Sequence, residues 1–362
     1  MKKELAAGCV FLSFMLPSTA FAADFSKLYV FGDSLSDTGN IYKATNQAYP
    51  PSSNYDPTQP GPYNPSQPYY NGHFSNGPIW VEYLGNELGL KPTLYTDLTT
   101  TPPTQGINFA FGGASTGIDN AVFPNQGLPG VLSQVGLFTK PYLDNNQKLD
   151  PNALYTVWAG ANDFLFLDDK DAATPVNNIS QALGLLAQAG AKNILVFNLP
   201  NLGALPAAKN GRDPITLEQS TTAFNTGLAT TIAALDKNYD LNIVSFDAYS
   251  LFDEVIHNPS IYGFNDVTNP CLTRLDVCQQ DPSKFLFWDD VHPTTFAHKL
   301  IADKALQAIK AQEVPESSTT LGMLTLGALG LVAMRKRQQQ KLHVTLKNRV
   351  LDAQSSRIKV ES

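Results

Sequence analysis

Short apolar runs alternate with helical patterns between Asp24 and Gln312, and this alternation restricts the possible folds more than any other feature. The runs are rich in β-branched or aromatic residues and end at Gly, Pro or Asp, as buried strands do; they lie at 27–31, 154–160, 193–200 and 241–246. Helical periodicity predicts helices over 79–88, 131–143, 176–189, 217–238 and 294–311. The order predicts an α/β fold, with a mostly parallel sheet covered by helices on both faces. Ligands of such sheets bind beyond the carboxyl ends of the strands.

The first residues have the layout of a secretory signal peptide. Lys2 and Lys3 precede the apolar run 5–16, and Ala20-Phe21-Ala22 is a small-residue cleavage site. We therefore expect residues 1–22 to be a signal peptide and the protein to be exported. Lipidation at Cys9 is not expected, because the apolar run follows this cysteine where it should precede it.

Cysteine usage agrees with export. Cys271 and Cys278 are the two cysteines outside the signal peptide, and they lie close together in a segment rich in Pro and Asn. In an oxidising compartment this pattern predicts a local disulfide. A metal site is not expected, because no second cysteine pair or nearby His completes four ligands.

An uncharged run near the other end, 319–334, is followed directly by Arg335-Lys336-Arg337. A buried core helix is one interpretation, since the run falls short of a usual membrane span. The absence of a polar face and the basic residues favour a short membrane anchor or sorting segment instead. The layout resembles the PEP-CTERM sorting signal of some Gram-negative bacteria, although Val314-Pro315-Glu316-Ser317 lacks the second Pro of that motif. We therefore expect a sorting segment over 313–337 and a basic tail over 338–362.

Charge also limits the partners. The formal net charge is −7, and because the C-terminal tail is basic, the body between the two ends is more acidic than this total. An acidic body argues against nucleic acid as a partner.

Two serines are candidate nucleophiles. Ser34 follows the clearest apolar run, in LYVFGDSLSDTGN, where Gly32 permits a tight turn. Ser115 lies in Gly113-Ala114-Ser115-Thr116-Gly117, which matches the G-x-S-x-G nucleophile elbow. That motif requires a helix after the serine, and the following residues have no helical period, so Ser34 is preferred. We expect Asp33, Asp37 and Asn40 to stabilise the turn rather than to react.

His292 is the candidate base. His343 lies beyond the uncharged run, His73 in a Pro/Asn-rich stretch, His257 at an expected helix end and His298 inside an expected helix. Asp289 precedes His292 by three residues, so its carboxylate can reach Nδ1 and leave Nε2 free to act as a base. A solvated turn with a helix cap is the alternative interpretation of this motif.

Gly113 and Asn162 are candidate oxyanion donors. Gly113 follows an apolar run as part of a Gly pair, and it can present a backbone N–H where a side chain would block approach. Asn162 follows another expected strand and can offer its side-chain amide.

The chain resembles the GDSL family of SGNH esterases and lipases, in order and in register over roughly residues 29–300. The blocks that carry the resemblance are FGDSLSDTGN, INFAFGGAST, Gly160-Ala161-Asn162-Asp163 and Asp289-Asp290-Val291-His292, with GHFSNGPIWVEYLGNELGL between the first two. The resemblance implies a flavodoxin-like, three-layer α/β/α domain, expected here over 23–312. It implies ester hydrolysis through an acyl-enzyme on Ser34, with Asp289 and His292 completing a triad. Ser34, Gly113 and Asn162 would bind the oxyanion, without a metal or other cofactor.

The substrate is less constrained. Larger members of the family are often lipolytic, which favours acyl esters, including those of phospholipids. A polysaccharide O-deacetylase is the alternative enzyme, and a non-catalytic surface or matrix protein is the alternative from another class. The stretch 49–76 is dense in Pro, Tyr, Asn and Gly and is expected to be a long surface loop. We expect export to the periplasm, the cell surface or the medium of a Gram-negative bacterium, transient membrane contact through the C-terminal segment and its sorting machinery, and no obligate protein partner.

Overall fold

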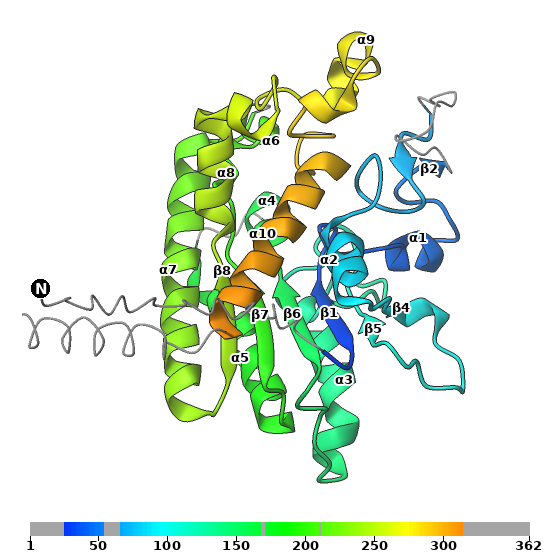
Figure 1. The fold of residues 1–362 in the computed structure, drawn as a ribbon, viewed down its shortest axis with the longest axis vertical. Coiled ribbons are helices and arrows are strands. Elements are labelled where there is room, and N and C mark those ends of the chain that lie inside the picture. The colour runs from blue at the N-terminus through cyan, green and yellow to red at the C-terminus, as the bar shows by residue number, and fades with distance from the viewer. Residues whose placement is uncertain (1–24, 54–65, 168–170, 210, 314–362) are drawn as a thin grey trace, which may run out of the picture. The chain divides into compact units, whose positions relative to one another are not determined.

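The computed structural model describes residues 25–53, 66–167, 171–209 and 211–313 (Figure 1). The expected signal peptide, the uncharged C-terminal run and the basic tail lie outside these residues. The chain divides into one compact unit that ends at Ala311 and a second over Gln312–Ser362. Within the described ranges, no helix is both long enough and apolar enough to cross a membrane.

A six-stranded sheet forms the centre of the first unit. Its order is β4-β5-β1-β6-β7-β8, and each neighbouring pair is parallel. The strands are β1 (Leu28–Gly32), β4 (Thr93–Leu94), β5 (Ile107–Asn108), β6 (Leu154–Trp158), β7 (Asn193–Phe197) and β8 (Asn242–Phe246). A separate parallel pair joins β2 (Ser52–Ser53) to β3 (Tyr69–Tyr70). The four predicted strands correspond to β1, β6, β7 and β8, and each begins within two residues of its predicted start. The short strands β2, β3 and β4 were not predicted.

Helices follow most of the strands. The α-helices are α1 (Asn40–Ala44), α2 (Trp80–Leu88), α3 (Val131–Asp144), α4 (Ala161–Leu165), α5 (Ala173–Ala189), α6 (Pro206–Lys209), α7 (Pro214–Asn238), α8 (Ala248–His257), α9 (Leu275–Cys278) and α10 (Thr295–Glu313). Short 3-10 turns lie at Tyr95–Asp97, Leu202–Ala204, Pro259–Tyr262, Cys271–Thr273 and Pro282–Lys284. All five predicted helices are present, and α8, whose end at His257 was expected, is the longest helix for which no range was predicted.

The helices cover both faces of the sheet. Trp80 of α2 packs on Trp158 of β6, with ring centroids 6.0 Å apart. Phe138 of α3 packs on Tyr155 of the same strand, at 6.1 Å. Tyr155 and Trp158 are three residues apart on one strand, so they point to opposite faces and the two helices lie on opposite sides. α3 contacts α5, which contacts α7, while Figure 1 shows α2 and α10 in front of the sheet. The expected three-layer α/β/α arrangement is confirmed.

The stretch 49–76 differs from the expected surface loop. Its described C-terminal part is buried at His73, Phe74, Ser75 and Asn76. Phe74 forms a small apolar cluster with Ile41 and Phe111. The Pro, Asn and Gly content predicted exposure, but a single large aromatic ring and specific hydrogen bonds bury this segment.

Candidate active site

β1 delivers Ser34 to the carboxyl edge of the sheet through a tight turn. A Cβ atom at Gly32 would lie 2.6 Å from the carbonyl oxygen of Trp158, so the close approach of β1 to β6 requires glycine there. The carbonyl of Asp33 accepts hydrogen bonds from the N–H groups of Ser36 and Asp37, which closes the turn around Ser34. Ser34 is 7% exposed, so its hydroxyl lies in a recess rather than on an open surface.

Asp37 ties this turn to the second block of the sequence. Its carboxylate accepts hydrogen bonds from the N–H groups of Gly39, Asn40 and Ile41. The same carboxylate accepts from Gly112 N–H at 2.7 Å. The Asn40 amide donates to the carbonyls of Asn108 and Ala110. These contacts confirm the expectation that Asp37 and Asn40 stabilise the turn.

The structure brings Ser34, His292 and Asp289 together in one line. Nε2 of His292 lies 2.8 Å from Oγ of Ser34. Nδ1 of the same ring lies 2.7 Å from Oδ2 of Asp289 and 2.9 Å from Oδ1. Oδ1 also accepts the N–H groups of Val291 and His292, so the four-residue turn orients its own carboxylate. This is the arrangement that a serine hydrolase uses to remove a proton from its nucleophile.

Electrostatics keep the Asp289 carboxyl ionised. Burial raises the pKa of Asp289, but the His292 ring and the hydrogen bonds from His292 and Val291 outweigh burial and hold this pKa below its ordinary value. Burial likewise raises the pKa of Asp33 to about 7, with only partial opposition from the Leu35 N–H and the His292 ring. The two carboxyls near His292 therefore differ, and Asp289 is the one that carries a full negative charge at neutral pH.

Gly113 and Asn162 lie at the ends of the strands that flank β1. Phe109 and Phe111 donate to carbonyls of β1, so the chain after β5 follows β1 as far as the Gly pair. Gly113 has φ +79°, and a Cβ atom there would lie 2.7 Å from Oδ1 of Asn120, so a side chain does not fit. The Asn162 amide donates to the carbonyl of Ala114 at 2.9 Å, which orients the amide and leaves its second hydrogen for another acceptor.

Ser115, the alternative nucleophile, is held in a turn. Its hydroxyl donates to the carbonyl of Asp119 at 2.6 Å and accepts the N–H of Gly117 at 3.1 Å. No helix follows it directly, as the sequence suggested, because α3 begins only at Val131. The elbow interpretation of this motif is therefore wrong.

The other described histidines lie elsewhere. His257 ends α8, as predicted, and His298 is buried within α10. His73 is buried against Glu82, with Nε2 3.0 Å from the carboxylate.

Two residues of the site escaped the sequence analysis. The hydroxyl of Tyr69 donates to Oδ2 of Asp289 at 2.7 Å. The ring of Phe74 packs on the His292 ring, with centroids 5.0 Å apart. Both lie in the stretch 49–76, and the block GHFSN was the one available signal, because Phe is unusual among the polar residues of an exposed loop.

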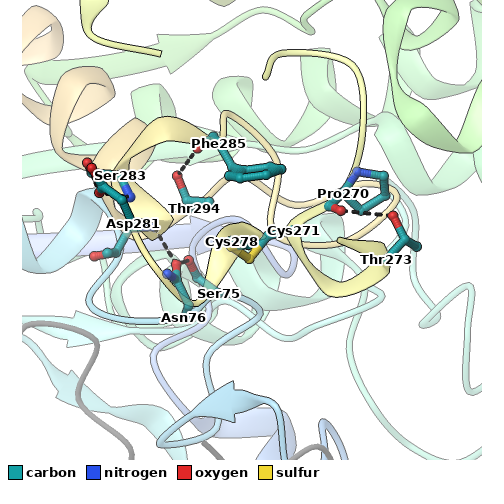
Figure 2. Close-up of a disulfide and its surroundings, with 11 residues drawn as sticks. Ser75, Asn76, Pro270, Cys271, Thr273, Cys278, Asp281, Ser283, Phe285 and Thr294 are labelled. Carbon is teal, nitrogen blue, oxygen red and sulfur yellow. Dashed lines mark hydrogen bonds between the residues drawn. A yellow bond between two sulfur atoms is a disulfide. The ribbon is translucent and has the colours of Figure 1, made fainter. Parts of the chain in front are cut away.

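Cys271 and Cys278 form the expected disulfide, with Cα atoms 5.4 Å apart. Figure 2 shows this bond with Ser75 and Asn76 among the residues around it. The N–H groups of Cys271 and Leu272 donate to the carbonyls of Phe287 and Trp288, directly before Asp289. The disulfide loop therefore supports the chain that leads into the Asp289–His292 turn.

Comparison with known proteins agrees with this geometry. Residues 28–305 match the family model of the GDSL-like Lipase/Acylhydrolase. Thermolabile hemolysin of Vibrio parahaemolyticus is 30% identical over 300 residues, which cover 78% of this chain and 63% of that protein. Phosphatidylcholine-sterol acyltransferase of Aeromonas hydrophila is 28% identical over 346 residues, which cover 81% of this chain and 94% of that protein. Among solved structures, an aryl esterase of M. smegmatis has a TM-score of 0.42 at 14% identity, over 79% of this chain and 99% of that one.

The matched range contains every residue of the Ser34–His292–Asp289 line as well as Gly113 and Asn162. Because the family model covers most of the chain, this protein belongs to the family of GDSL-like lipases and acylhydrolases, and it is a serine ester hydrolase.

Proposed function

We propose that this protein cleaves carboxylic esters through an acyl-enzyme on Ser34. The observation that carries the proposal is the 2.8 Å contact between Ser34 Oγ and His292 Nε2, with Asp289 2.7 Å from the opposite ring nitrogen. His292 takes the Ser34 proton as Oγ attacks the acyl carbonyl, and it returns that proton to the leaving alcohol. Water, activated by the same imidazole, then hydrolyses the acyl-enzyme.

The oxyanion of the tetrahedral intermediate is bound by three donors. We assign the N–H groups of Ser34 and Gly113 and the side-chain amide of Asn162. Their support is the placement of all three residues after neighbouring elements, β1, β5 and β6, at the carboxyl edge of the sheet. The substrate carbonyl would lie between Ser34 and these donors, with its acyl chain directed away from His292.

A lipid acyl ester, including that of a phospholipid, is the substrate class that we favour. Phe166 and Leu167 directly follow α4, which carries Asn162, and they are 48% and 50% exposed. Apolar side chains left exposed beside an active site favour contact with an acyl chain. The relatives support this class, since the name of one specifies a phosphatidylcholine acyltransferase.

We also propose export from a Gram-negative cell. Its support is the order of charges, apolar run and small residues over 1–22, together with the disulfide, which needs an oxidising compartment. The segment 313–337 would act as a sorting signal with transient membrane contact.

Labelling with a serine-directed fluorophosphonate, followed by peptide mapping, tests the nucleophile. We expect the label on Ser34, and none after the substitution Ser34→Ala. A label on another serine, or full ester hydrolysis by Ser34→Ala, would overturn the assignment. Activity on p-nitrophenyl esters of increasing chain length tests the substrate class: hydrolysis confined to acetyl esters would favour the deacetylase.

A further inference from the structure

Tyr69 contacts the acid of the triad from a distant part of the chain. Its hydroxyl donates to Oδ2 of Asp289, 220 positions away in the sequence, at 2.7 Å. Oδ2 is also the oxygen that lies closer to Nδ1 of His292. The turn 289–292 itself supplies two backbone N–H groups to Oδ1 alone. Tyr69 is thus a donor from outside the turn to the oxygen that faces the imidazole.

The segment that carries Tyr69 is fastened to the same turn. The Ser75 hydroxyl donates to the carbonyl of Pro293 at 2.9 Å, and Asn76 Oδ1 accepts the N–H of Thr295 at 2.9 Å. Phe74 packs on His292 and also lies so close to Gly112 that a Cβ atom there would be 2.3 Å from its ring. Residues 69–76 therefore contact Asp289 and His292 and also lie against Gly112, the neighbour of the oxyanion donor Gly113.

The ring of Tyr69 packs on the disulfide cluster. That cluster consists of Cys271, Cys278, Phe285 and Trp288, all buried, and Tyr69 is partly buried against it. Figure 2 shows this disulfide next to Phe285 and Thr294. With its ring held by apolar contacts and its hydroxyl held by Asp289, Tyr69 has little rotational freedom.

We propose that Tyr69 is a positioning residue that fixes Asp289 Oδ2 and limits the negative charge which that oxygen presents to His292; this inference rests on the proposed function. The hydrogen bond from a phenol shares the carboxylate charge, because a charge-assisted hydrogen bond moves electron density toward the donor. Asp289 then stabilises the imidazolium enough for proton removal from Ser34, while the ring still releases the proton to the leaving alcohol. No bond is made or broken at Tyr69.

The effect on pH dependence has a definite sign. Loss of the hydroxyl leaves more negative charge at Oδ2, and a more negative carboxylate holds a proton on the imidazole more strongly. The acid limb of the kcat/KM profile must therefore move to higher pH. The groups that face this pair are Ser34 and Asp33 from the β1 turn, His298 from α10 and Tyr49 from the loop after α1. Asp290 follows Asp289 directly in the chain, and the substitution leaves all of these groups in place.

The test compares Tyr69→Phe with Tyr155→Phe. Tyr155 also donates a single hydroxyl hydrogen bond from a packed ring, to the carbonyl of Asp150, at the amino end of the sheet. For Tyr69→Phe we expect kcat to fall about 10-fold. This factor corresponds to the lower end of the free energy that a hydrogen bond to a charged group contributes. KM should stay within about 2-fold, and the acid limb should move up by about half a pH unit or more. Tyr155→Phe should leave all three unchanged.

The outcomes separate this inference from the proposed function. Unchanged kcat and pH profile in Tyr69→Phe, or equal changes in Tyr155→Phe, would overturn the role of Tyr69. Ser34→Ala, measured in parallel with the same soluble ester, reports on the acyl-enzyme mechanism alone. If Ser34→Ala is inactive and Tyr69→Phe behaves as the wild type does, only the positioning role fails.

Discussion

Asn162 has one amide hydrogen committed to the protein and one available for a ligand. The committed hydrogen bonds the carbonyl of Ala114, which belongs to the same loop as Gly113. Asp163, the next residue, accepts hydrogen bonds from the N–H and the hydroxyl of Thr116. The two side chains together hold the end of β6 against the loop after β5, so the second amide hydrogen of Asn162 has a defined direction.

At this scale, Asn162→Ala tests the oxyanion assignment. We expect kcat on a soluble ester to fall by about 10²–10³, because one preorganised donor to the oxyanion is lost, while KM changes little. Steady-state kinetics give both values. Asn193→Ala is the matched control, since its amide donates to the carbonyl of Pro151 at the opposite end of the sheet. Wild-type kcat in Asn162→Ala would contradict the assignment.

Whether a contact of the site could be predicted depends on how far apart its two residues lie in the sequence. Asp289 and His292 were predictable because three positions on a turn bring a carboxylate to Nδ1 by local geometry alone. Ser34 was preferred over Ser115 because a strand–turn context can be recognised locally. The hydrogen bond from Tyr69 to Asp289 was not predictable, since nothing local to either residue specifies a partner 220 positions away.

Among the elements, the segment 69–76 depends on a buried ion pair. The side chain of His73 is 5% exposed and that of Glu82, on α2, is 35% exposed. Nδ1 of His73 lies 2.8 Å from the carbonyl of Tyr70, and Nε2 lies 3.0 Å from Glu82 Oε2. Nδ1 faces the Tyr70 carbonyl and Nε2 forms an ion pair with Glu82, and both contacts favour the doubly protonated ring. Burial lowers the pKa of His73, but the Glu82 carboxylate outweighs burial and raises this pKa above its ordinary value.

This pair predicts a loss of stability as the pH rises. Because the pKa of His73 is raised on folding, its contribution is complete below the ordinary His value and is lost as pH rises through the folded value. His73→Gln should lower the free energy of unfolding at pH 6 by about 2 kcal/mol, less than for a fully buried pair because Glu82 is partly exposed. Its stability should also decline less between pH 6 and pH 9.

Denaturant unfolding at several pH values measures both effects. Glu82→Gln provides the partner variant, and the double variant shows whether the two losses are coupled. His257→Gln is the control, since His257 is exposed on α8. If His73→Gln retains the pH dependence of the wild type, the ion pair does not have the assigned role.

The ends of elements were less predictable than their existence. α7 begins at Pro214, three residues before its apolar pattern starts, because the Asp213 side chain caps it by accepting the N–H of Ile215. The apolar run before Gly113 has only two regular strand residues, Ile107 and Asn108, yet Phe109 and Phe111 still donate to β1. Periodicity detects the apolar face of an element, whereas caps and irregular pairing depend on single hydrogen bonds.

On the scale of the whole molecule, the α/β class could be predicted because strands and helices have different periods and alternate along much of the chain. The tertiary contacts of the stretch 49–76 could not, since its burial depends on Ile41, Phe111 and the distant 285–295 segment. The disulfide loop is joined to that segment, which carries Asp289 and His292, through backbone hydrogen bonds to Phe287 and Trp288.

Removal of the disulfide should therefore affect both stability and turnover. For Cys271→Ala/Cys278→Ala we expect a free energy of unfolding lower by about 2–3 kcal/mol, the value for a short cross-linked loop. We also expect a lower kcat, because the support before Asp289 is loosened. Thermal unfolding and steady-state kinetics of the oxidised wild type and the double variant provide the comparison. Dithiothreitol should move the wild type toward the variant and leave the variant unchanged. Equal Tm values for the two proteins would contradict this prediction.

The four amide groups held by Asp37 have a consequence for recombination between relatives. One carboxylate joins the N–H groups of Gly39, Asn40 and Ile41 in the first block to that of Gly112 in the second. A chimera that exchanges only one of these blocks must recreate this junction, whereas exchange of both together transfers it intact. The stretch between the blocks carries Tyr69 and Phe74, which contact Asp289 and His292, so a chimera that replaces this stretch must keep these two residues if the reaction centre is to be inherited as one piece.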